Sequence, residues 1–338
     1  MEKIWKKFLI ELSYCSNKYL LPPEYISLII TYKCNFHCQS CSIWQNKNFN
    51  ELKEKDWLNI VNQLKIFNPN TFIEINGGEP LIRKELTLKL IKKLKKHFKR
   101  ITLNTNGLLI NKKLVNELEK SSLNAVKISF YSLNKNIHNF LRGHSQAYDQ
   151  SLKAIKLLNQ SKIKTEVGIL ITSKNISGLK KLIKYLQQLK NISMILQPLD
   201  ESINSKESKE KNKNTLIDKL WPETKEIESF FSWLSKNSSK TKNSQAQIRA
   251  IKDYYLNPKS TLNYRCFAGQ RSLIIQPDGK VSLCFKGKEI GDLKKEKLQN
   301  ILKSENGQIE RRTIKNCQKY CRIVGCNFSR SFIEFFRN

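Results

Sequence analysis

Short β-branched runs alternate with amphipathic stretches through the first 200 residues, and this alternation constrains the fold more than any other feature. Runs such as SLIIT and VGILIT are apolar at successive positions, which is typical of parallel strands that are covered on both faces. A β-then-α order repeated six times predicts parallel strands joined by crossover helices. The expected strands are Tyr25–Lys33, Thr71–Asn76, Arg100–Asn104, Ala125–Tyr131, Thr165–Thr172 and Ile192–Gln197.

Amphipathic spacing between these runs predicts the helices that would cover the sheet. Six β-α units are fewer than the eight that close a complete barrel. The sequence therefore predicts an α/β fold, a partial (β/α)6 barrel that stays open, with an open doubly wound sheet as the competing interpretation. The expected helices are Trp57–Phe67, Leu86–Phe98, Lys113–Lys120, Tyr148–Gln160 and Leu179–Leu189.

Composition divides the chain into four expected segments. The first begins with lysines and a short apolar run that Glu11 interrupts, which favours an amphipathic helix over a signal peptide. The third segment begins with the polar run DESINSKESKEKNKN, which predicts a flexible insertion, and then shows a helical pattern over Leu216–Ser235. The fourth segment contains a predicted hairpin around Pro277-Asp278-Gly279. The segments are an N-terminal helical extension (1–24), the α/β core (25–200), the insertion and linker (201–263) and a small cysteine-rich module (264–338).

The chain carries 61 basic and 29 acidic side chains, a formal net charge of +32. Only eleven of the basic residues are arginines, whereas surfaces that read nucleic acids favour arginine for bidentate contacts. No apolar run reaches the roughly 18 residues that span a bilayer. We therefore expect a cytoplasmic protein with a solvated lysine surface, no membrane span and no dedicated nucleic-acid surface.

Nine cysteines, an odd number gathered mostly in two groups, indicate metal binding rather than a disulfide framework. Cys34, Cys38 and Cys41 form a C-x3-C-x2-C triplet directly after the first expected strand. Three thiolates on one loop can hold three corners of a 4Fe–4S cluster and leave the fourth iron open to a ligand. A zinc site, for which His37 lies within the loop, is the alternative. The lone Cys15 is expected to be a small buried apolar residue.

The triplet, together with Asn76-Gly77-Gly78-Glu79-Pro80 after the second strand, resembles radical S-adenosylmethionine (SAM) enzymes over about residues 25–200. The resemblance implies that the three cysteines ligate a 4Fe–4S cluster whose open iron is chelated by the amino and carboxylate groups of SAM. One electron would then cleave SAM to methionine and a 5′-deoxyadenosyl radical, which takes a hydrogen atom from the substrate. The family's usual aromatic residue before the third cysteine is Ser40 here, and Phe36 and Trp44 are candidates for its place.

The same resemblance supplies the expected SAM-binding residues. Paired glycines let a backbone approach a ligand closely, and the bend that they open would receive the SAM amino group. Ser129 would approach the ribose or carboxylate, while Arg142, in a segment resembling H-x-x-x-R-G, would pair with the carboxylate through its planar fork. An ordinary turn, a buried serine and a surface arginine are the structural alternatives. The expected cofactor-binding residues are Gly77, Gly78, Glu79, Pro80, Asn106, Ser129 and Arg142.

A second cysteine group occupies the last quarter of the chain. Cys266 and Cys284 flank Gly279 in a C-x12-G-x4-C pattern, and Cys317, Cys321 and Cys326 follow as C-x3-C-x4-C. The pattern resembles the auxiliary-cluster domains called SPASM or twitch. A full SPASM domain has seven cysteines and two auxiliary clusters. The five cysteines here therefore imply one auxiliary 4Fe–4S cluster, held by Cys266, Cys284 and two of the remaining three cysteines. A structural zinc ribbon is the alternative.

These patterns together predict a radical SAM oxidoreductase or maturase with no identified catalytic acid or base. Its substrate would be a ribosomal peptide or a small molecule, and its electron would come from an external donor such as a flavodoxin or ferredoxin. Only about 24 residues precede the first strand, which weakens the peptide interpretation because no leader-binding domain is evident. The alternatives are an RNA-modifying radical SAM enzyme and a non-enzymatic iron–sulfur or zinc protein that transfers electrons or acts as a scaffold.

Overall fold

A computed structural model describes residues 2–46, 50–200 and 216–323. The chain divides into two compact units, each of which is described by itself. Unit 1 takes residues from 1–32, 48–102 and 262–338, and unit 2 takes residues from 33–47 and 103–261. Most of the polar run expected as an insertion, and the predicted ligand Cys326, lie outside the described residues.

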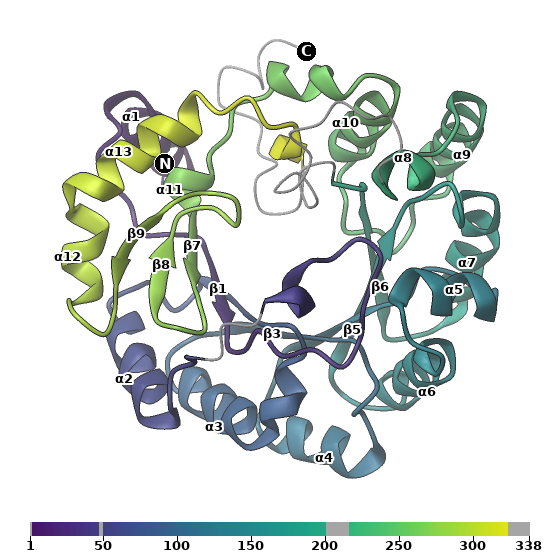
Figure 1. The fold of residues 1–338 in the computed structure, drawn as a ribbon, viewed down its shortest axis with the longest axis horizontal. Helices are drawn as coiled ribbons and strands as arrows, with labels where there is room; N and C mark the ends of the chain where they lie inside the picture. Colours follow the sequence, from purple (N-terminus) through teal and green to yellow (C-terminus); the bar gives the residue numbers. More distant parts are fainter. Residues whose placement is uncertain (1, 47–49, 201–215, 324–338) are drawn as a thin grey trace. The chain divides into compact units, whose positions relative to one another are not determined.

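Unit 1 contains five neighbouring strands in the order β2-β1-β7-β8-β9. The last four of them are labelled in Figure 1. β1 pairs in parallel with both β2 and β7, because crossover segments return the chain to the same end of the sheet. β8 pairs antiparallel with β7 and β9, as the predicted hairpin requires. The bounds are β1 Tyr25–Ile29, β2 Phe72–Asn76, β7 Ser272–Ile275, β8 Lys280–Ser282 and β9 Glu289–Asp292.

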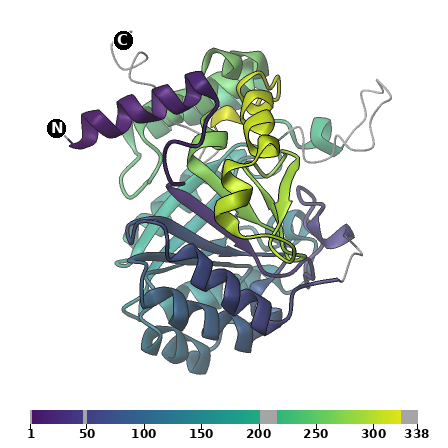
Figure 2. The same ribbon diagram turned by 90° about the vertical axis from the view of Figure 1, so that its left-hand side faces the viewer.

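The helices of unit 1 bury their apolar stripes in its core. Trp57 of α2 and Leu94 of α3 are fully buried, as the 3.6-residue spacing of their apolar neighbours dictates. α1 is anchored near its C-terminal end, where the Tyr14 ring lies 5.0 Å from the Phe267 ring, and its first turns extend beyond the other elements of this unit (Figure 2). The bounds are α1 Glu2–Ser16, α2 Glu54–Leu64, η2 Pro80–Arg83, α3 Lys84–Lys95, α11 Ala268–Arg271, α12 Leu298–Lys303, α13 Glu305–Lys315 and η4 Cys321–Ile323.

Unit 2 is built on three parallel strands, with β5 between β4 and β6. Val126, Ile128, Val167 and Ile169 are fully buried. On the other face they alternate with the half-buried Lys127 and Ser129 in β4 and with the buried Glu166, Gly168 and Leu170 in β5. The bounds are β4 Ala125–Ser129, β5 Lys164–Leu170, β6 Ile192–Gln197, η1 Ile43–Gln45, α4 Lys112–Lys120, α5 Lys135–Arg142, α6 Ala147–Asn159, α7 Ile176–Gln188, α8 Leu216–Leu220, α9 Thr224–Lys236 and α10 Gln245–Leu256. η3 (Pro258–Asn263) and β3 (Arg100–Thr105) span the boundaries between the units.

All six strands predicted for the core are present, and each begins within one residue of its expected start. Several predicted ends are too late, because the chain leaves the sheet in apolar residues that belong to the following loops; β1 ends at Ile29 rather than Lys33. The single helical pattern predicted over Leu216–Ser235 is wrong, because Pro222 separates α8 from α9. No helix among the described residues is long and apolar enough to cross a membrane.

Candidate functional site

The first cysteine loop, residues 33–46 of unit 2, follows β1 along the chain. Cys38 is buried and Cys34 and Cys41 are partly buried. The loop folds back on itself, because the Phe36 N–H donates to the Cys34 sulfur at 3.5 Å and the Cys41 N–H donates to the Cys38 carbonyl at 3.2 Å. The three thiols therefore share one apolar cluster, whose other members are Phe36, Leu108 and Ala147.

Arg142, at the end of α5, places a positive charge against this loop. Its guanidinium lies 5.4 Å from the centre of the Phe36 ring, and Nη1 donates to the Tyr131 hydroxyl at 2.9 Å. Burial by itself would lower the pKa of Arg142, but the Cys38 sulfur, the Tyr131 oxygen and the Cys34 sulfur together raise it above its ordinary value. The side chain is only 7% exposed, so the structural alternative of a surface arginine is wrong.

The surroundings of Arg142 fit an anionic iron–sulfur cluster on this loop. Its Nε is buried and has no hydrogen-bond partner among the described residues, and a buried donor without a partner is costly unless a ligand supplies the acceptor. Burial raises the pKa of the Cys41 thiol, so a nearby cation would help the loop to hold thiolates. Three thiols beside one fixed cation match the ligand set that an incompletely coordinated 4Fe–4S cluster needs.

Asn106, which follows β3, fixes the start of the cysteine loop. Its Nδ2 donates to Asn35 Oδ1 at 2.6 Å, and its Oδ1 accepts from the Leu108 N–H at 2.9 Å. The backbone carbonyl of Asn106 accepts from the Ser151 hydroxyl at 2.9 Å. Both ends of the amide are thus bonded within unit 2, while the contact expected between Asn106 and SAM stays a prediction. Ser129 is half-buried at the end of β4, and its role also stays a prediction.

The Gly77–Pro80 bend belongs to unit 1, where it is bonded to the chain that continues from β1. A Cβ at Gly77 would lie 2.9 Å from the Thr31 carbonyl oxygen, and the Gly78 N–H donates to the same oxygen at 2.8 Å. Glu79 is fully buried, and its Oε1 accepts from the Leu81 N–H at 3.0 Å, which caps η2. Only glycine allows this close approach, and the contact of the bend with SAM stays a prediction.

The two aromatic residues considered as replacements at Ser40 differ in their surroundings. Phe36 is fully buried, and its ring stacks on the His144 ring at 4.6 Å, so it is part of the core. Trp44 presents its ring edge-on to His37 at 4.8 Å. Its indole N–H is buried and has no hydrogen-bond partner among the described residues. Trp44 therefore remains a candidate for a ligand contact, and Phe36 does not.

Four cysteines of the second group come together in unit 1. Burial raises the pKa of Cys266 to about 12, and the nearby Cys284 and Cys321 sulfurs add to the rise. Burial also raises the pKa of Cys284, and the Cys317 sulfur adds to it. Backbone N–H groups two residues further on donate to the Cys284 and Cys317 sulfurs at 3.4 Å. Four thiols from three chain segments thus lie within electrostatic reach of one another, which fits a saturated cluster.

Arg322 joins the segments that carry these cysteines. Its Nη1 donates to the Leu262 carbonyl at 2.9 Å and to the Tyr264 carbonyl at 2.6 Å, and its Nη2 donates to the Cys317 carbonyl. The side chain is 8% exposed, and its charge opposes the effect of burial on the pKa of Cys266. Sequence analysis missed this residue, although an arginine directly after a predicted metal ligand is the signal that could have drawn attention to it.

No three His, Cys, Asp or Glu side chains in the described part of the chain converge closely enough to hold a single metal ion. In a tetrahedral zinc site with Zn–S bonds near 2.3 Å, the sulfurs stand about 3.8 Å apart. The cysteines of a cubane cluster bind different irons, so they need not converge on one point.

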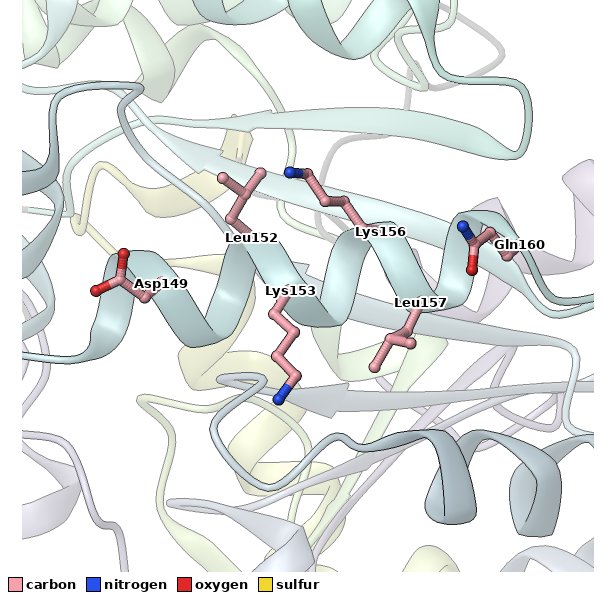
Figure 3. Close-up of a pocket in the computed structure, with 6 residues that line it drawn as sticks. All are labelled: Asp149, Leu152, Lys153, Lys156, Leu157 and Gln160. Atoms are coloured by element: carbon pink, nitrogen blue, oxygen red, sulfur yellow. The ribbon is translucent and has the colours of Figure 1, made fainter.

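One surface hollow accompanies α6 in unit 2 (Figure 3). All six residues around it come from this helix and the position that follows it, and their side chains project to different sides of the helix. Asp149 is already paired with Lys135 at 2.7 Å. The hollow contains neither cysteine nor histidine, and we assign it no function. Its lining consists of Asp149, Leu152, Lys153, Lys156, Leu157 and Gln160.

Comparison with known families identifies the chain. The sequence profile of the radical SAM superfamily matches residues 28–186, which include the first cysteine loop, the Gly77–Pro80 bend and Arg142. Residues 28–186 therefore form a radical SAM domain. The profile of the SPASM iron–sulfur cluster-binding domain matches residues 266–327, so the chain combines a radical SAM domain with a C-terminal SPASM domain.

Two curated relatives each resemble about half of the chain. A probable GTP 3′,8-cyclase of Sulfurisphaera tokodaii is 28% identical over 164 residues, which are 48% of this chain and 51% of the relative. A PqqA peptide cyclase of Granulibacter bethesdensis is 23% identical over 170 residues, which are 50% of this chain and 45% of the relative. The chain thus spans about half the length of the curated relatives that it matches.

A solved structure resembles most of the chain. SuiB of Streptococcus suis, bound to S-adenosylmethionine, superposes with a TM-score of 0.67 at 17% identity and covers 90% of this chain and 71% of SuiB. SuiB bound to its precursor peptide SuiA gives a TM-score of 0.65. At this identity the likeness shows the fold, and it confirms the predicted α/β class of the radical SAM type with a C-terminal auxiliary module.

The comparisons also confirm the predicted family and its cofactor class. The first domain is of the type that works with a 4Fe–4S cluster and SAM, and the second is an iron–sulfur cluster-binding domain. Which cysteines ligate each cluster, and which residues contact SAM, stay predictions.

Proposed function

We propose that this chain is an enzyme that cleaves SAM reductively and abstracts a hydrogen atom from a carbon of its substrate. The observation that carries the proposal is the packing of Cys34, Cys38 and Cys41 into one cluster beside the buried guanidinium of Arg142. When bound, a 4Fe–4S cluster with one open iron supplies the electron that splits the SAM sulfonium bond into methionine and a 5′-deoxyadenosyl radical.

The chain's own residues orient and shield this chemistry. Arg142 offsets negative charge at the cysteine loop and offers a free Nε donor toward a carboxylate. Asn106 holds Asn35 and thereby the first turn of the loop. In unit 1, the paired glycines before Glu79 would offer backbone rather than side chains to the SAM amino group. Hydrogen abstraction needs no side-chain acid or base, which agrees with the absence of a predicted catalytic residue.

The SPASM module would complete an oxidation. With SAM and the first cluster bound, removal of one hydrogen atom from the substrate would leave one electron and one proton still to be released before a closed-shell product with a new bond or double bond could form. Cys266, Cys284, Cys317 and Cys321 would hold the electron acceptor, and an external flavodoxin- or ferredoxin-type donor would supply the electron for SAM cleavage.

We infer that the substrate is a ribosomally made peptide. Two findings support a peptide: one curated relative is a PqqA peptide cyclase, and SuiB, which shares the fold of this chain, binds the precursor peptide SuiA. A small molecule is the second candidate, favoured by the 28% identity to a probable GTP cyclase. The similar proteins favour neither an RNA substrate nor a scaffold without catalysis.

The test is anaerobic reconstitution of the full chain with iron, sulfide, dithionite and SAM, followed by mass spectrometry of 5′-deoxyadenosine. We expect the wild-type chain to form this product and the Cys34→Ala variant to form none. Cys266→Ala should retain measurable SAM cleavage while it loses about four irons, the content of one cluster. Equal loss of all iron in both variants would show that the two cysteine groups do not form separate sites.

A further inference from the structure

The corner at the end of α5, residues 141–144, lies directly against the first cysteine loop within unit 2. Gln39, which follows Cys38, donates its N–H to the Leu141 carbonyl at 3.1 Å. The Phe36 ring stacks on the His144 ring at 4.6 Å and faces the Arg142 guanidinium at 5.4 Å. The corner therefore contacts the loop on both sides of Cys38, between the outer two cysteines.

Gly143 is the point of closest approach between the corner and the loop. It ends α5 with φ +59°, a left-handed conformation that residues with a Cβ adopt at a cost. A Cβ at this position would lie 2.0 Å from the His37 carbonyl oxygen and 2.5 Å from the His37 carbonyl carbon. Both obstructing atoms belong to the backbone, so no rotamer change of a side chain could relieve the overlap.

We propose that Gly143 is a positioning residue for the radical SAM cluster. Because it carries no Cβ, the α5 corner can pack against the Phe36–Gln39 backbone and act as a template for it. This packing sets the position of Cys38 between Cys34 and Cys41. The inference rests on the proposed function, because it assigns the three cysteines to one cluster. It gives a physical reason for a glycine after Arg142 that is independent of any contact with SAM.

The two constraints at Gly143 predict different effects for different substitutions. Asparagine tolerates the left-handed conformation better than other residues with a Cβ, so a position that served only as a helix cap would accept Gly143→Asn. The overlap with the His37 backbone arises from the Cβ itself, which asparagine and alanine both carry. If the corner positions the loop, both variants must displace it. Gly178 of α7 offers a matched control, since a Cβ there would meet nothing within 4 Å.

The experiment compares the full-length wild type with Gly143→Ala, Gly143→Asn and Gly178→Ala after anaerobic reconstitution. The readouts are iron per chain and the change that SAM produces in the electron paramagnetic resonance spectrum of the reduced protein, which reports on an iron open to SAM. We expect both Gly143 variants to lose about half of the wild-type iron, one of two clusters, together with the SAM-dependent change. Gly178→Ala should match the wild type.

Circular dichroism of the iron-free chains shows whether each variant folds. A folded Gly143→Asn that loads iron and responds to SAM like the wild type would overturn the inference and leave Gly143 a helix cap. Should neither Gly143 variant fold, His144→Leu decides, because it removes the stacking of the corner on Phe36 but leaves Phe36 against Arg142. A several-fold weaker SAM response in His144→Leu supports the inference, and an unchanged response refutes it. If the wild type takes up both clusters but yields no 5′-deoxyadenosine, the proposed reaction fails while this loading comparison still stands.

Discussion

The two cysteine groups are brought together in different ways. In unit 2 all three thiols lie on one short loop. To bring them together, the chain only has to fold this loop back on itself and pack it against α5. In unit 1 the four described thiols come from segments more than fifty residues apart in sequence, from Cys266 to Cys321. Closing longer chain segments costs more entropy, about 0.6 kcal/mol for each doubling of length. The second group therefore depends more on long-range contacts that hold its segments together.

Each group has one buried arginine, and the bonding of the two arginines differs. Arg142 gives one hydrogen bond to the Tyr131 hydroxyl and keeps its Nε without a partner among the described residues. Arg322 gives its two terminal nitrogens to three backbone carbonyls, and its Nε, like that of Arg142, has no partner among the described residues. The terminal nitrogens of Arg322 join separate chain segments, whereas Nη1 of Arg142 bonds a side chain, the Tyr131 hydroxyl. We therefore expect Arg142 to act on a ligand and Arg322 to hold its own site together.

Removing the Arg322 guanidinium is expected to have the largest effect. Arg322→Gln breaks bonds to the Leu262, Tyr264 and Cys317 carbonyls, and hydrogen bonds to charged groups contribute about 1.5–3 kcal/mol each. We expect the free energy of unfolding of unit 1 to fall by about 3 kcal/mol, with loss of most auxiliary-cluster iron. Urea unfolding and iron analysis measure both. Arg312→Gln, an exposed change on α13, is the matched control, and equal iron in both variants would contradict the assignment.

A change at Arg142 should act on SAM rather than on assembly alone. Arg142→Lys keeps the positive charge beside the cysteine loop but loses the planar fork and the buried Nε donor. We expect SAM to bind about 10–100-fold more weakly, the range seen when an outer partner of a metal site is lost, while the auxiliary iron is retained. Equilibrium binding of SAM to the reconstituted protein measures the effect. SAM affinity equal to that of the wild type would show that charge alone suffices.

Breaking the link between Asn106 and Asn35 should have a smaller effect. Asn106→Ala removes the 2.6 Å bond to the loop and the bond to the Leu108 N–H, a loss of about 1–2 kcal/mol. We expect slower loading of the first cluster and an unchanged auxiliary site, as followed by the rise of iron–sulfur absorbance during reconstitution. Asn136→Ala, at an exposed position of α5, is the control. Loading at the wild-type rate would leave Asn106 only its predicted contact with SAM.

The same contrast between local and long-range features explains what the sequence could predict. The strands, the Cys34–Cys41 loop and the glycine bend follow from periodicity and spacing within short windows, and the fold class followed from their order. Arg322 and the α5 corner were missed because their roles depend on backbone carbonyls, which leave no pattern in the sequence. Cys15 was expected to be buried as an apolar residue, but it is exposed on the same side of α1 as Phe8 and Leu12, where nothing in the described chain covers it.

His138 of α5 allows a test that does not touch the thiols, because it lies beside Arg142 rather than at the cysteines. It is fully buried, and its Nδ1 accepts from the Tyr131 N–H at 3.1 Å, so the ring is neutral with its proton on Nε2. Burial, with a further contribution from Arg142, lowers the pKa of His138 to about 3. The other groups that face it are the rings of Phe130, Tyr131 and Tyr148, and none of them offers a carboxylate that would favour the charged form.

Because the pKa of His138 is lower in the folded chain than the ordinary value near 6.5, the unfolded chain binds more protons between these two values. The stabilisation is complete above pH 6.5 and is lost as the pH falls toward 3, by up to about 2 kcal/mol between pH 6.5 and 5. His138→Asn keeps an acceptor for the Tyr131 N–H but cannot titrate, so its unfolding free energy should fall less steeply over this interval. Denaturant unfolding of the iron-free chains at several pH values measures the slope. An equally steep fall in both proteins would show that acid destabilises unit 2 through carboxylates rather than through the histidine beside Arg142.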